Sequence, residues 1–325
     1  MSATATGIVH QRVASADGTV IGYRTLGSGP GLIVVGGTLR SAVDYLPLAR
    51  SLAGSFEVHV MDRRGRGLSD AQDGDYSISK EREDLLAVQR ATGATLVFGH
   101  SFGGLVGLET ARRHQIFTTV VVYEPGVSIG HQMPLGWVDQ YERLVASGEH
   151  RKAFACMVKH AGYAPGPLPA MPLWAVAAIL RLGIRGAAWA ATSSLLETSL
   201  KEHREVAGLD APSAIRFSTI GAAVILLGGA QSPTFMRRDL LGHLQEVIPG
   251  AQVELLEGLG HAAPSDGPPE PVAAVIRRHL TGASVPRKGL QQSSPSKMEA
   301  FQRTSGVLTS APPSCTRRRQ APPDV

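Results

Sequence analysis

Short apolar runs alternate with amphipathic segments along most of the chain, and this alternation constrains the fold more than any other feature. The runs are rich in Val, Ile and Leu at consecutive positions, and they occupy residues 32–35, 56–61, 94–98, 118–123, 222–227 and 252–256. Strands of this kind are buried on both faces, which is typical of parallel sheets. The segments between them carry apolar residues at helical spacing, at 41–53, 79–90, 102–114, 233–247 and 270–280. The sequence therefore predicts an α/β fold with a doubly wound, mostly parallel sheet, preceded by a β-hairpin at 8–13 and 20–23.

One long interruption divides this pattern. About a hundred residues, 125–220, separate two predicted strands, whereas the median connection in such folds is about five residues. The segment is helical in character, and an insertion at this place lies above the carboxyl ends of the strands, where ligands bind. We expect residues 1–124 and 221–281 to form the α/β core. Residues 125–220 are expected to form a helical lid with an apolar inner face, the alternative being a helical packing element.

The last segment, residues 282–325, is rich in Ser, Pro, Gln and basic residues and shows no periodicity. Its seven Lys and Arg, against two acidic residues, account for the whole formal charge of +5, so the rest of the chain is neutral. Such a segment cannot bury enough surface to offset the entropy of ordering, and we expect it to be disordered. A neutral body with a basic tail lacks the basic face that nucleic-acid binding requires, so no nucleic-acid partner is expected.

The cysteine content, the first residues and the length of the apolar runs together predict where in the cell the protein is located. Cys156 and Cys315 are far apart in sequence and make no disulfide framework, which suits a reducing compartment. The first residues lack the basic start and apolar run of a secretory signal. No uncharged apolar run reaches the ~18 residues that a membrane span needs. The sequence predicts a cytoplasmic protein without a membrane span, and it leaves the oligomeric state open.

A G-x-S-x-G motif, Gly99-His100-Ser101-Phe102-Gly103, follows the predicted strand 94–98 and precedes the predicted helix 102–114. The pattern alone is weak in a chain with 37 glycines. The strand–turn–helix setting, however, is what a nucleophile elbow requires. The turn is tight, so side chains at positions 99 and 103 would collide with neighbouring backbone. We therefore expect Ser101 to be a nucleophile at the sheet edge rather than part of an accidental Gly-Ser turn.

Three further motifs occur with the elbow in an order that resembles the α/β-hydrolase family. Residues 32–37, LIVVGG, resemble the oxyanion loop of that family. Residues 61–69, MDRRGRGLS, resemble its D-x-R-G-x-G-x-S loop, and residues 258–261, GLGH, resemble its late histidine loop. The resemblance covers residues from about 8 to 281. It implies an α/β-hydrolase fold with a Ser–acid–His triad, and a structural role for the loop at 62–69.

The resemblance also assigns roles to matching positions. His261 would be the general base, since a serine hydroxyl is a poor nucleophile without one. Thr38 and Phe102 would offer backbone N–H groups to the oxyanion, and each such donor is worth about 3–4 kcal/mol in related chemistry. Gly36 replaces the histidine that the family commonly has before Gly37. Because the oxyanion hole is built from backbone, that replacement removes no donor.

The acid of the triad departs from the usual pattern. The family commonly places an Asp after the strand that here is 222–227, and this chain has Ser232 there. Some members carry the acid one strand earlier, where Glu124 follows the run 118–123 and Pro125 holds it extended. A carboxylate there can fix the tautomer of the imidazole. Glu124 is the first candidate and Asp239, inside the predicted helix 233–247, is the second. A Glu124 that merely pairs with the insertion is the structural alternative.

Other kinds of site are not indicated. Gly258 and Gly260 with Ala263 fit a loosened dinucleotide fingerprint, but the chain has neither a βαβ unit there nor an acidic residue about 20 positions later. The glycines at 27–31 lack the Gly-Lys-Ser/Thr of a phosphate loop. No HExxH or CxxC spacing occurs, so no metal and no cofactor are expected.

Together the motifs predict a serine hydrolase of the carboxylesterase type. It would cleave a small or medium apolar ester, thioester or lactone through an acyl-serine, with a small-molecule acyl substrate as partner. Leu39, Trp137, Trp174 and Trp189 are candidate substrate-binding residues, although packing within the insertion would explain the tryptophans equally well. Two alternatives stay open. The missing late Asp favours a non-catalytic ligand-binding or interaction protein on the same fold, and the same triad could also serve a cofactor-free lyase or transferase.

Overall fold

The sheet confirms the predicted alternation. The computed structural model describes residues 7–72, 74–162 and 166–282. Within these residues the strands are β1 (Val9–Ala14), β2 (Val20–Gly27), β3 (Gly31–Val35), β4 (Glu57–Met61), β5 (Leu96–His100), β6 (Thr119–Tyr123), β7 (Ala223–Gly229) and β8 (Gln252–Leu256). They form one sheet in the order β1-β2-β4-β3-β5-β6-β7-β8, in which β1 and β2 run antiparallel to their neighbours and all other pairs are parallel. The result is a mostly parallel, doubly wound sheet.

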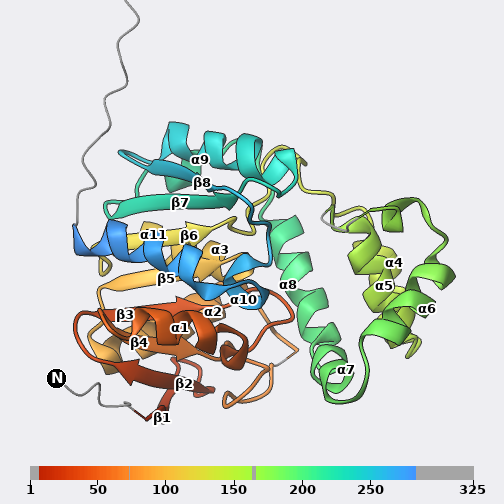
Figure 1. The fold of residues 1–325 in the computed structure, drawn as a ribbon, viewed down its shortest axis with the longest axis horizontal. Helices are drawn as coiled ribbons and strands as arrows, with labels where there is room; N and C mark the ends of the chain where they lie inside the picture. The colour runs from red at the N-terminus through yellow and green to blue at the C-terminus, as the bar shows by residue number, and fades with distance from the viewer. Residues whose placement is uncertain (1–6, 73, 163–165, 283–325) are drawn as a thin grey trace, which may run out of the picture. The chain divides into compact units, whose positions relative to one another are not determined.

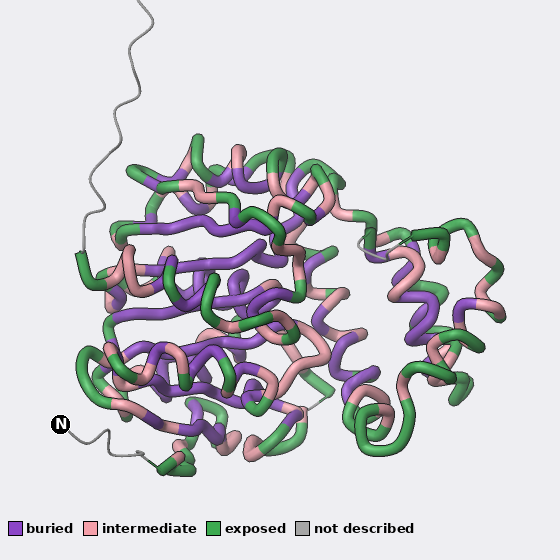
Figure 2. Tube along the Cα trace, viewed as in Figure 1, coloured by how far each residue is buried: buried purple, intermediate pink, exposed green. Residues whose placement is uncertain are grey.

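Helices cover both faces of this sheet (Figure 1). On one face lie α1 (Leu46–Leu52) and α11 (Pro269–Thr281), which share an apolar cluster with the sheet. On the other lie α2 (Ile78–Thr92), α3 (Phe102–Arg113) and α9 (Leu241–Val247), in a second cluster. Figure 2 shows the central strands buried between these layers. Strands that are apolar at consecutive positions therefore have a partner for each face, which is why the parallel sheet is stable.

Local signals in the sequence fix where helices begin and end, as α2 illustrates. The side chain of Ser77 accepts a hydrogen bond from the backbone N–H of Lys80 at 3.4 Å, and so caps the first turn. Gly93 ends the helix in the left-handed conformation, at a φ of 68°. Short helical turns complete the core: 3-10 helices at Ala42–Tyr45 and Ile215–Phe217, a π-helical turn at Phe235–Leu240, and α10 (Ala263–Asp266).

The interruption after β6 is helical, as the sequence predicts. Its elements are α4 (Val138–Ala146), α5 (His150–His160), a 3-10 turn at Leu168–Ala170, α6 (Leu173–Gly183), α7 (Gly186–Ser193) and α8 (Leu196–Gly208). We call α4 to α8 the helical insertion. It has an apolar cluster of its own, in which Tyr141, Phe154 and Leu196 are buried. In Figure 1, α8 runs from the rest of the insertion back along the carboxyl edge of the sheet.

The order of the strands places a crevice at this carboxyl edge. From β3 the chain crosses to β4 on one side and then returns to β5 on the other side. In open α/β sheets such a switch point is where ligands bind, beyond the carboxyl ends of the strands. The loops after β3 and β5 meet there.

The predicted boundaries are close to the observed ones. Strand β8 has the predicted limits, and β5 is displaced by two residues, from 94–98 to Leu96–His100. The predicted helix at 233–247 is a π-helical turn followed by α9. The predicted disorder of residues 282–325 falls on positions that lie, apart from residue 282, outside the described residues.

Candidate active site

Ser101 occupies a strained turn between β5 and α3. Its φ of 53° and ψ of −121° lie outside the regions that L-residues favour. A Cβ atom at Gly99 would lie 2.5 Å from the carbonyl oxygen of Gly103, and one at Gly103 would lie 2.2 Å from that of Val35. Only glycine can therefore occupy these two positions of the turn. The G-x-S-x-G motif has the geometry of the predicted elbow.

The side chains of Ser101, His261 and Glu124 form a continuous chain of contacts. His261 Nε2 lies 3.2 Å from Ser101 Oγ, and His261 Nδ1 lies 2.7 Å from Glu124 Oε2. A carboxylate only accepts hydrogen bonds, so Nδ1 carries the proton of the neutral ring and the lone pair of Nε2 faces the serine. The three residues come from separate loops, after β5, β6 and β8. The structure therefore brings together the three side chains that the sequence suggested.

Glu124 is held rigidly in this position. Its side chain is fully buried, and Oε1 accepts a hydrogen bond of 2.8 Å from the backbone N–H of Gly229 at the end of β7. Its φ of 44° is in the left-handed region, so the prediction that Pro125 holds this residue extended is wrong. Its own N–H donates to the carbonyl of Leu227. By contrast, Asp239 is exposed on the π-helical turn. The geometry favours Glu124 over Asp239 as the partner of His261.

The two expected oxyanion donors line a cavity with the serine. Thr38 follows β3 and Phe102 begins α3, and both contribute to the wall of a cavity that also contains Ser101 and His261. Tyr45 accepts a hydrogen bond of 2.8 Å from the N–H of Gly37, which fixes the residue before Thr38.

A buried group of charges lies beneath this loop. Arg63 pairs with Glu202 of α8 at 2.7 Å and with Glu81 of α2 at 3.0 Å, and Arg66 pairs with the same Glu202. Arg63 and Arg66 also donate to the carbonyl of Gly37, each at 3.3 Å. The loop at 62–69 thus ties the oxyanion loop to both the core and the helical insertion.

Glu202 is ionised in this environment. Burial raises its pKa, but the charges of Arg63 and Arg66 and a hydrogen bond from the Thr38 side chain outweigh burial, so the pKa lies below its usual value. The Arg63 guanidinium also lies 4.7 Å from the centroid of the Phe102 ring. Both residues that were expected to supply oxyanion donors are therefore in contact with the buried charge group.

His100 has a structural role that its variable position in the motif did not predict. Its Nε2 lies 2.8 Å from the carbonyl oxygen of His261, so Nε2 carries the proton and Nδ1 accepts from the Tyr45 hydroxyl at 2.7 Å. Burial, and then the neighbouring His261, lower the pKa of His100 well below its usual value, so the ring is neutral. Because Tyr45 also accepts from Gly37, one directional chain joins the oxyanion loop to the backbone of His261.

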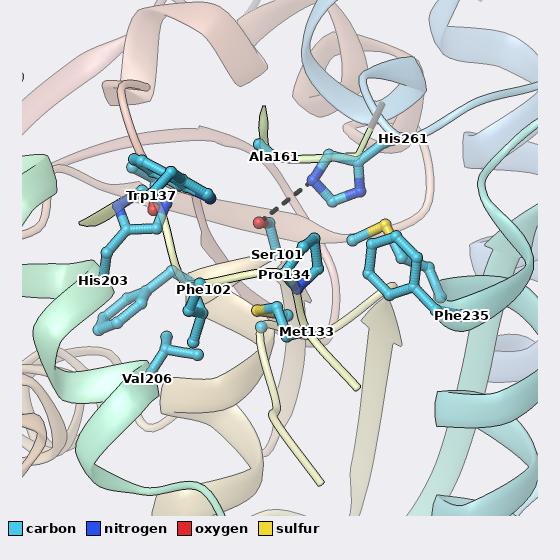
Figure 3. Close-up of a pocket in the computed structure, with 14 residues that line it drawn as sticks. Ser101, Phe102, Met133, Pro134, Trp137, Ala161, His203, Val206, Phe235 and His261 are labelled. Atoms are coloured by element: carbon cyan, nitrogen blue, oxygen red, sulfur yellow. Dashed lines mark hydrogen bonds between the residues drawn. The ribbon is translucent and has the colours of Figure 1, made fainter. Parts of the chain in front are cut away.

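Two hollows meet at Ser101. The first is lined by Trp137 and His203 of the insertion in addition to the core residues named above, and we call it the Trp137 cavity (Figure 3). The second is lined by Arg40 and by the segment around His261, and we call it the Arg40 cleft. His203 was missed by the sequence reasoning because it belongs to no motif. Its only signal was helical spacing, since it lies one turn from Ser199 and Val206.

The four candidate substrate-binding residues have different positions. Trp137 is 7% exposed and lines the Trp137 cavity, and Leu39 lines the Arg40 cleft. Trp189 packs under the guanidinium of Arg151, at 3.6 Å from its ring centroid, and lines neither hollow. Trp174 is 71% exposed and also lines neither. The structure therefore does not bring Trp174 and Trp189 to the serine.

Two further observations concern the described residues. None of the helices resolved between residues 7 and 282 combines the length and apolar character needed to cross a membrane. Within residues 7–72, 74–162 and 166–282, no group of three or more His, Cys, Asp or Glu side chains could hold a metal ion.

The chain is similar to known hydrolases. An alpha/beta hydrolase from Sphaerobacter thermophilus DSM 20745 is 28% identical, with a TM-score of 0.70 over 83% of this chain and 100% of that one. The esterase RhEst1 from Rhodococcus sp. ECU1013 is 22% identical, with a TM-score of 0.58 over 85% of this chain and 99% of that one.

A curated relative is similar over a shorter stretch. The 2-(acetamidomethylene)succinate hydrolase of Mesorhizobium japonicum is 28% identical over 104 residues, which are 31% of this chain and 37% of the relative. The family model described as "Alpha/beta hydrolase family" matches residues 32–275. This match spans the oxyanion loop, the elbow and the histidine loop, and it confirms the resemblance: the chain belongs to the alpha/beta hydrolase family.

Proposed function

We propose that this hydrolase is a serine esterase that cleaves a small or medium apolar ester, thioester or lactone through an acyl-enzyme at Ser101. The observation that carries the proposal is the chain of contacts from Glu124 to His261 to Ser101, at 2.7 Å and 3.2 Å. A serine hydroxyl becomes a useful nucleophile when a base is within reach and that base is oriented by a third group.

Each residue has one role in the proposed reaction. His261 Nε2 takes the proton of Ser101 as Oγ attacks the acyl carbon, and Glu124 stabilises the resulting imidazolium. The same proton then passes from Nε2 to the leaving oxygen or sulfur, and the bond to the leaving group breaks. Water, deprotonated by His261, attacks the acyl-serine and releases the acid and the free serine.

The loop after β3 would stabilise the oxyanion that forms in the transition state. Backbone N–H groups of Thr38 and Phe102 are the proposed donors, and each is worth about 3–4 kcal/mol in related enzymes. The contacts of Arg63 and Arg66 with Gly37 support this role, because a donor acts best when the loop does not reorganise during the reaction.

The Trp137 cavity supports an apolar acyl group. No Asp, Glu, Lys or Arg is among the described residues that line it, and most of its wall is aromatic or aliphatic. Because Trp137 and His203 belong to the helical insertion, we propose that the insertion acts as a lid that forms part of the acyl site. Burial of a hydrocarbon chain contributes about 0.8 kcal/mol per methylene, so affinity should rise with chain length until the cavity is full.

Pre-steady-state hydrolysis of 4-nitrophenyl esters, from acetate to octanoate, tests the proposal. We expect a burst of 4-nitrophenol equal to the enzyme concentration, and a rise in kcat/KM with acyl length followed by a fall. Ser101→Ala should abolish the burst. Absence of ester turnover by folded wild-type protein, or turnover that survives in Ser101→Ala, would overturn the assignment.

A further inference from the structure

Away from Thr38, Ser101 and His261, two rings with polar nitrogens interrupt the mostly apolar wall of the Trp137 cavity. They belong to Trp137 and to His203, whose rings pack edge to face with centroids 4.9 Å apart. Figure 3 shows the two side chains side by side, on the far side of Ser101 from Phe235. Polar groups in an apolar pocket set orientation and specificity, because an unpaired buried donor or acceptor is costly.

The hydrogen-bonding state of His203 follows from its contacts. Its Nδ1 lies 2.7 Å from the carbonyl oxygen of Ser199, so Nδ1 carries a proton. Burial lowers the pKa of His203, which keeps the ring neutral near pH 7. Nε2 is then an acceptor, and no donor from the described part of the chain bonds to it. His203 therefore presents a lone pair to a ligand.

Trp137 supplies the complementary group. Its indole N–H is buried, and it donates to no acceptor among residues 7–72, 74–162 and 166–282. The Trp137 residue as a whole is only 7% exposed. A buried N–H without an acceptor is uncommon in folded proteins, since it forfeits the hydrogen bond that water gave it. The two adjacent rings thus line the same cavity, with the unpaired indole N–H enclosed in its wall.

The chemistry of the triad identifies which part of the substrate enters this cavity. His261 must deliver its proton to the leaving group, so the leaving group lies on the side of the His261 loop. Gly260 and Ala262, on either side of His261, line the Arg40 cleft. Ser101, Thr38 and His261 line both hollows, so the composition of the walls makes the distinction. The mostly apolar Trp137 cavity suits the acyl group, and the leaving group then lies in the cleft.

We infer that Trp137 and His203 select acyl groups that carry a neutral hydroxyl, which accepts a hydrogen bond from the indole N–H and donates one to the imidazole Nε2. This inference rests on the proposed ester hydrolysis and specifies its substrate class. A hydroxyl satisfies both groups at once, whereas a carboxylate would satisfy only the donor and an alkyl group would satisfy neither. The two residues are thus specificity determinants at the acyl end.

A matched pair of esters tests the inference in the full-length protein. 4-Nitrophenyl 3-(4-hydroxyphenyl)propanoate and 4-nitrophenyl 3-phenylpropanoate differ only by one hydroxyl. For wild type we expect kcat/KM to be about tenfold to a hundredfold higher for the hydroxylated ester, the range that one or two well-made buried hydrogen bonds confer. Equal rates for the two esters in wild type would overturn the inference.

Variants attribute the preference to the two rings. Trp137→Phe and His203→Phe should each reduce the ratio of the two kcat/KM values towards one, whatever their effect on the absolute rates. Trp174→Phe, a matched change at a tryptophan that is 71% exposed, should keep the wild-type ratio. A ratio that survives in both cavity variants would contradict the assignment. Partial misfolding of a variant would lower kcat/KM for both esters by the same factor, so their ratio would not change.

A binding measurement separates this inference from the proposed reaction. Calorimetric titration of Ser101→Ala with 4-(4-hydroxyphenyl)butan-2-one and with 4-phenylbutan-2-one reports the preference without turnover. Tighter binding of the hydroxylated ketone, together with no ester hydrolysis by wild type, would retain the hydroxyl site and overturn the esterase proposal. Ester hydrolysis by wild type, with no preference for the hydroxylated compound in either measurement, would retain the esterase proposal and overturn the hydroxyl site.

Discussion

Ser101, Glu124 and Leu39 all have positive φ values, of 53°, 44° and 58°, and all three adjoin the candidate site. A non-glycine residue in this region costs about 1–3 kcal/mol, and such residues persist where the surroundings over-determine them. Gly99 fixes the turn at Ser101, and the hydrogen bonds to Leu227 and Gly229 fix Glu124. Three of the four non-glycine residues with positive φ in the described part of the chain therefore adjoin the candidate site; the fourth is His131, at 60°.

The role of Glu124 gives a prediction for a single amide substitution. Glu124→Gln keeps the size and an acceptor for the Gly229 N–H, but it cannot stabilise the imidazolium of His261. We expect kcat for a 4-nitrophenyl ester to fall by about 10⁴-fold, as amide replacement does in related triads. The matched control is Asp239→Asn, which alters an exposed carboxylate and should leave kcat at the wild-type level. A large fall in kcat for Asp239→Asn, with a wild-type kcat for Glu124→Gln, would show that Asp239 is the acid that orients His261.

At the scale of elements, α8 joins the helical insertion to the core through charge as well as packing. Glu202 on α8 lies between Arg63 and Arg66, and these in turn contact the carbonyl of Gly37. A buried charge that loses its partner is destabilising because it cannot return to water. The insertion and the loop at Gly37 are therefore coupled through one carboxylate.

Glu202→Gln tests this coupling. It leaves Arg66 without its buried counter-charge and Arg63 with Glu81 alone, and we expect the free energy of unfolding to fall by about 3–5 kcal/mol. Because the Gly37–Thr38 loop also loosens, kcat should fall more than KM rises. Urea unfolding and steady-state kinetics measure the two effects. Glu197→Gln changes an exposed carboxylate of the same helix and should alter stability by less than about 0.5 kcal/mol. Equal effects of the two substitutions would argue against the coupling.

At the scale of the whole molecule, the sequence predicted the sheet, and the meeting of Ser101, Glu124 and His261 at its edge, better than it predicted the insertion. Buried parallel strands and the elbow are local patterns, and the order of the motifs indicated which loops meet. The inward face of α6 was not predictable, because its residues are apolar all round and only Val176 is buried. Trp174 is a candidate substrate-binding residue by sequence, but it is exposed in the structure. His100 and His203 were missed because their partners, Tyr45 and Trp137, are far away in sequence.

Buried neutral histidines make the stability of the whole molecule depend on pH. Burial lowers the pKa of His59, His100 and His203 below the ordinary value of 6.5. As the pH falls below 6.5 the unfolded chain binds protons that the folded chain does not, so unfolding becomes more favourable. We expect the free energy of unfolding to be greatest above pH 6.5 and to decrease between pH 6.5 and 5. Urea unfolding at each pH measures this.

His100→Gln isolates the contribution of one of these rings. Glutamine can still donate to the carbonyl of His261, but it does not titrate. The variant should be less stable than wild type at pH 7.5, and its stability should decrease less between pH 6.5 and 5. A pH dependence identical to that of wild type would show that His100 is not held neutral.

Labelling by a fluorophosphonate tests whether Ser101 is a nucleophile activated by His261 and Glu124, as we propose. The measurement compares wild type, Ser101→Ala and Ser147→Ala, an exposed serine at the end of α4, with the modified residue located by mass spectrometry. We expect one phosphonyl group per chain on Ser101 in wild type and Ser147→Ala, and none in Ser101→Ala. Folded wild-type protein that takes up no label, or takes it up on another residue, would show that Ser101 is not an activated nucleophile.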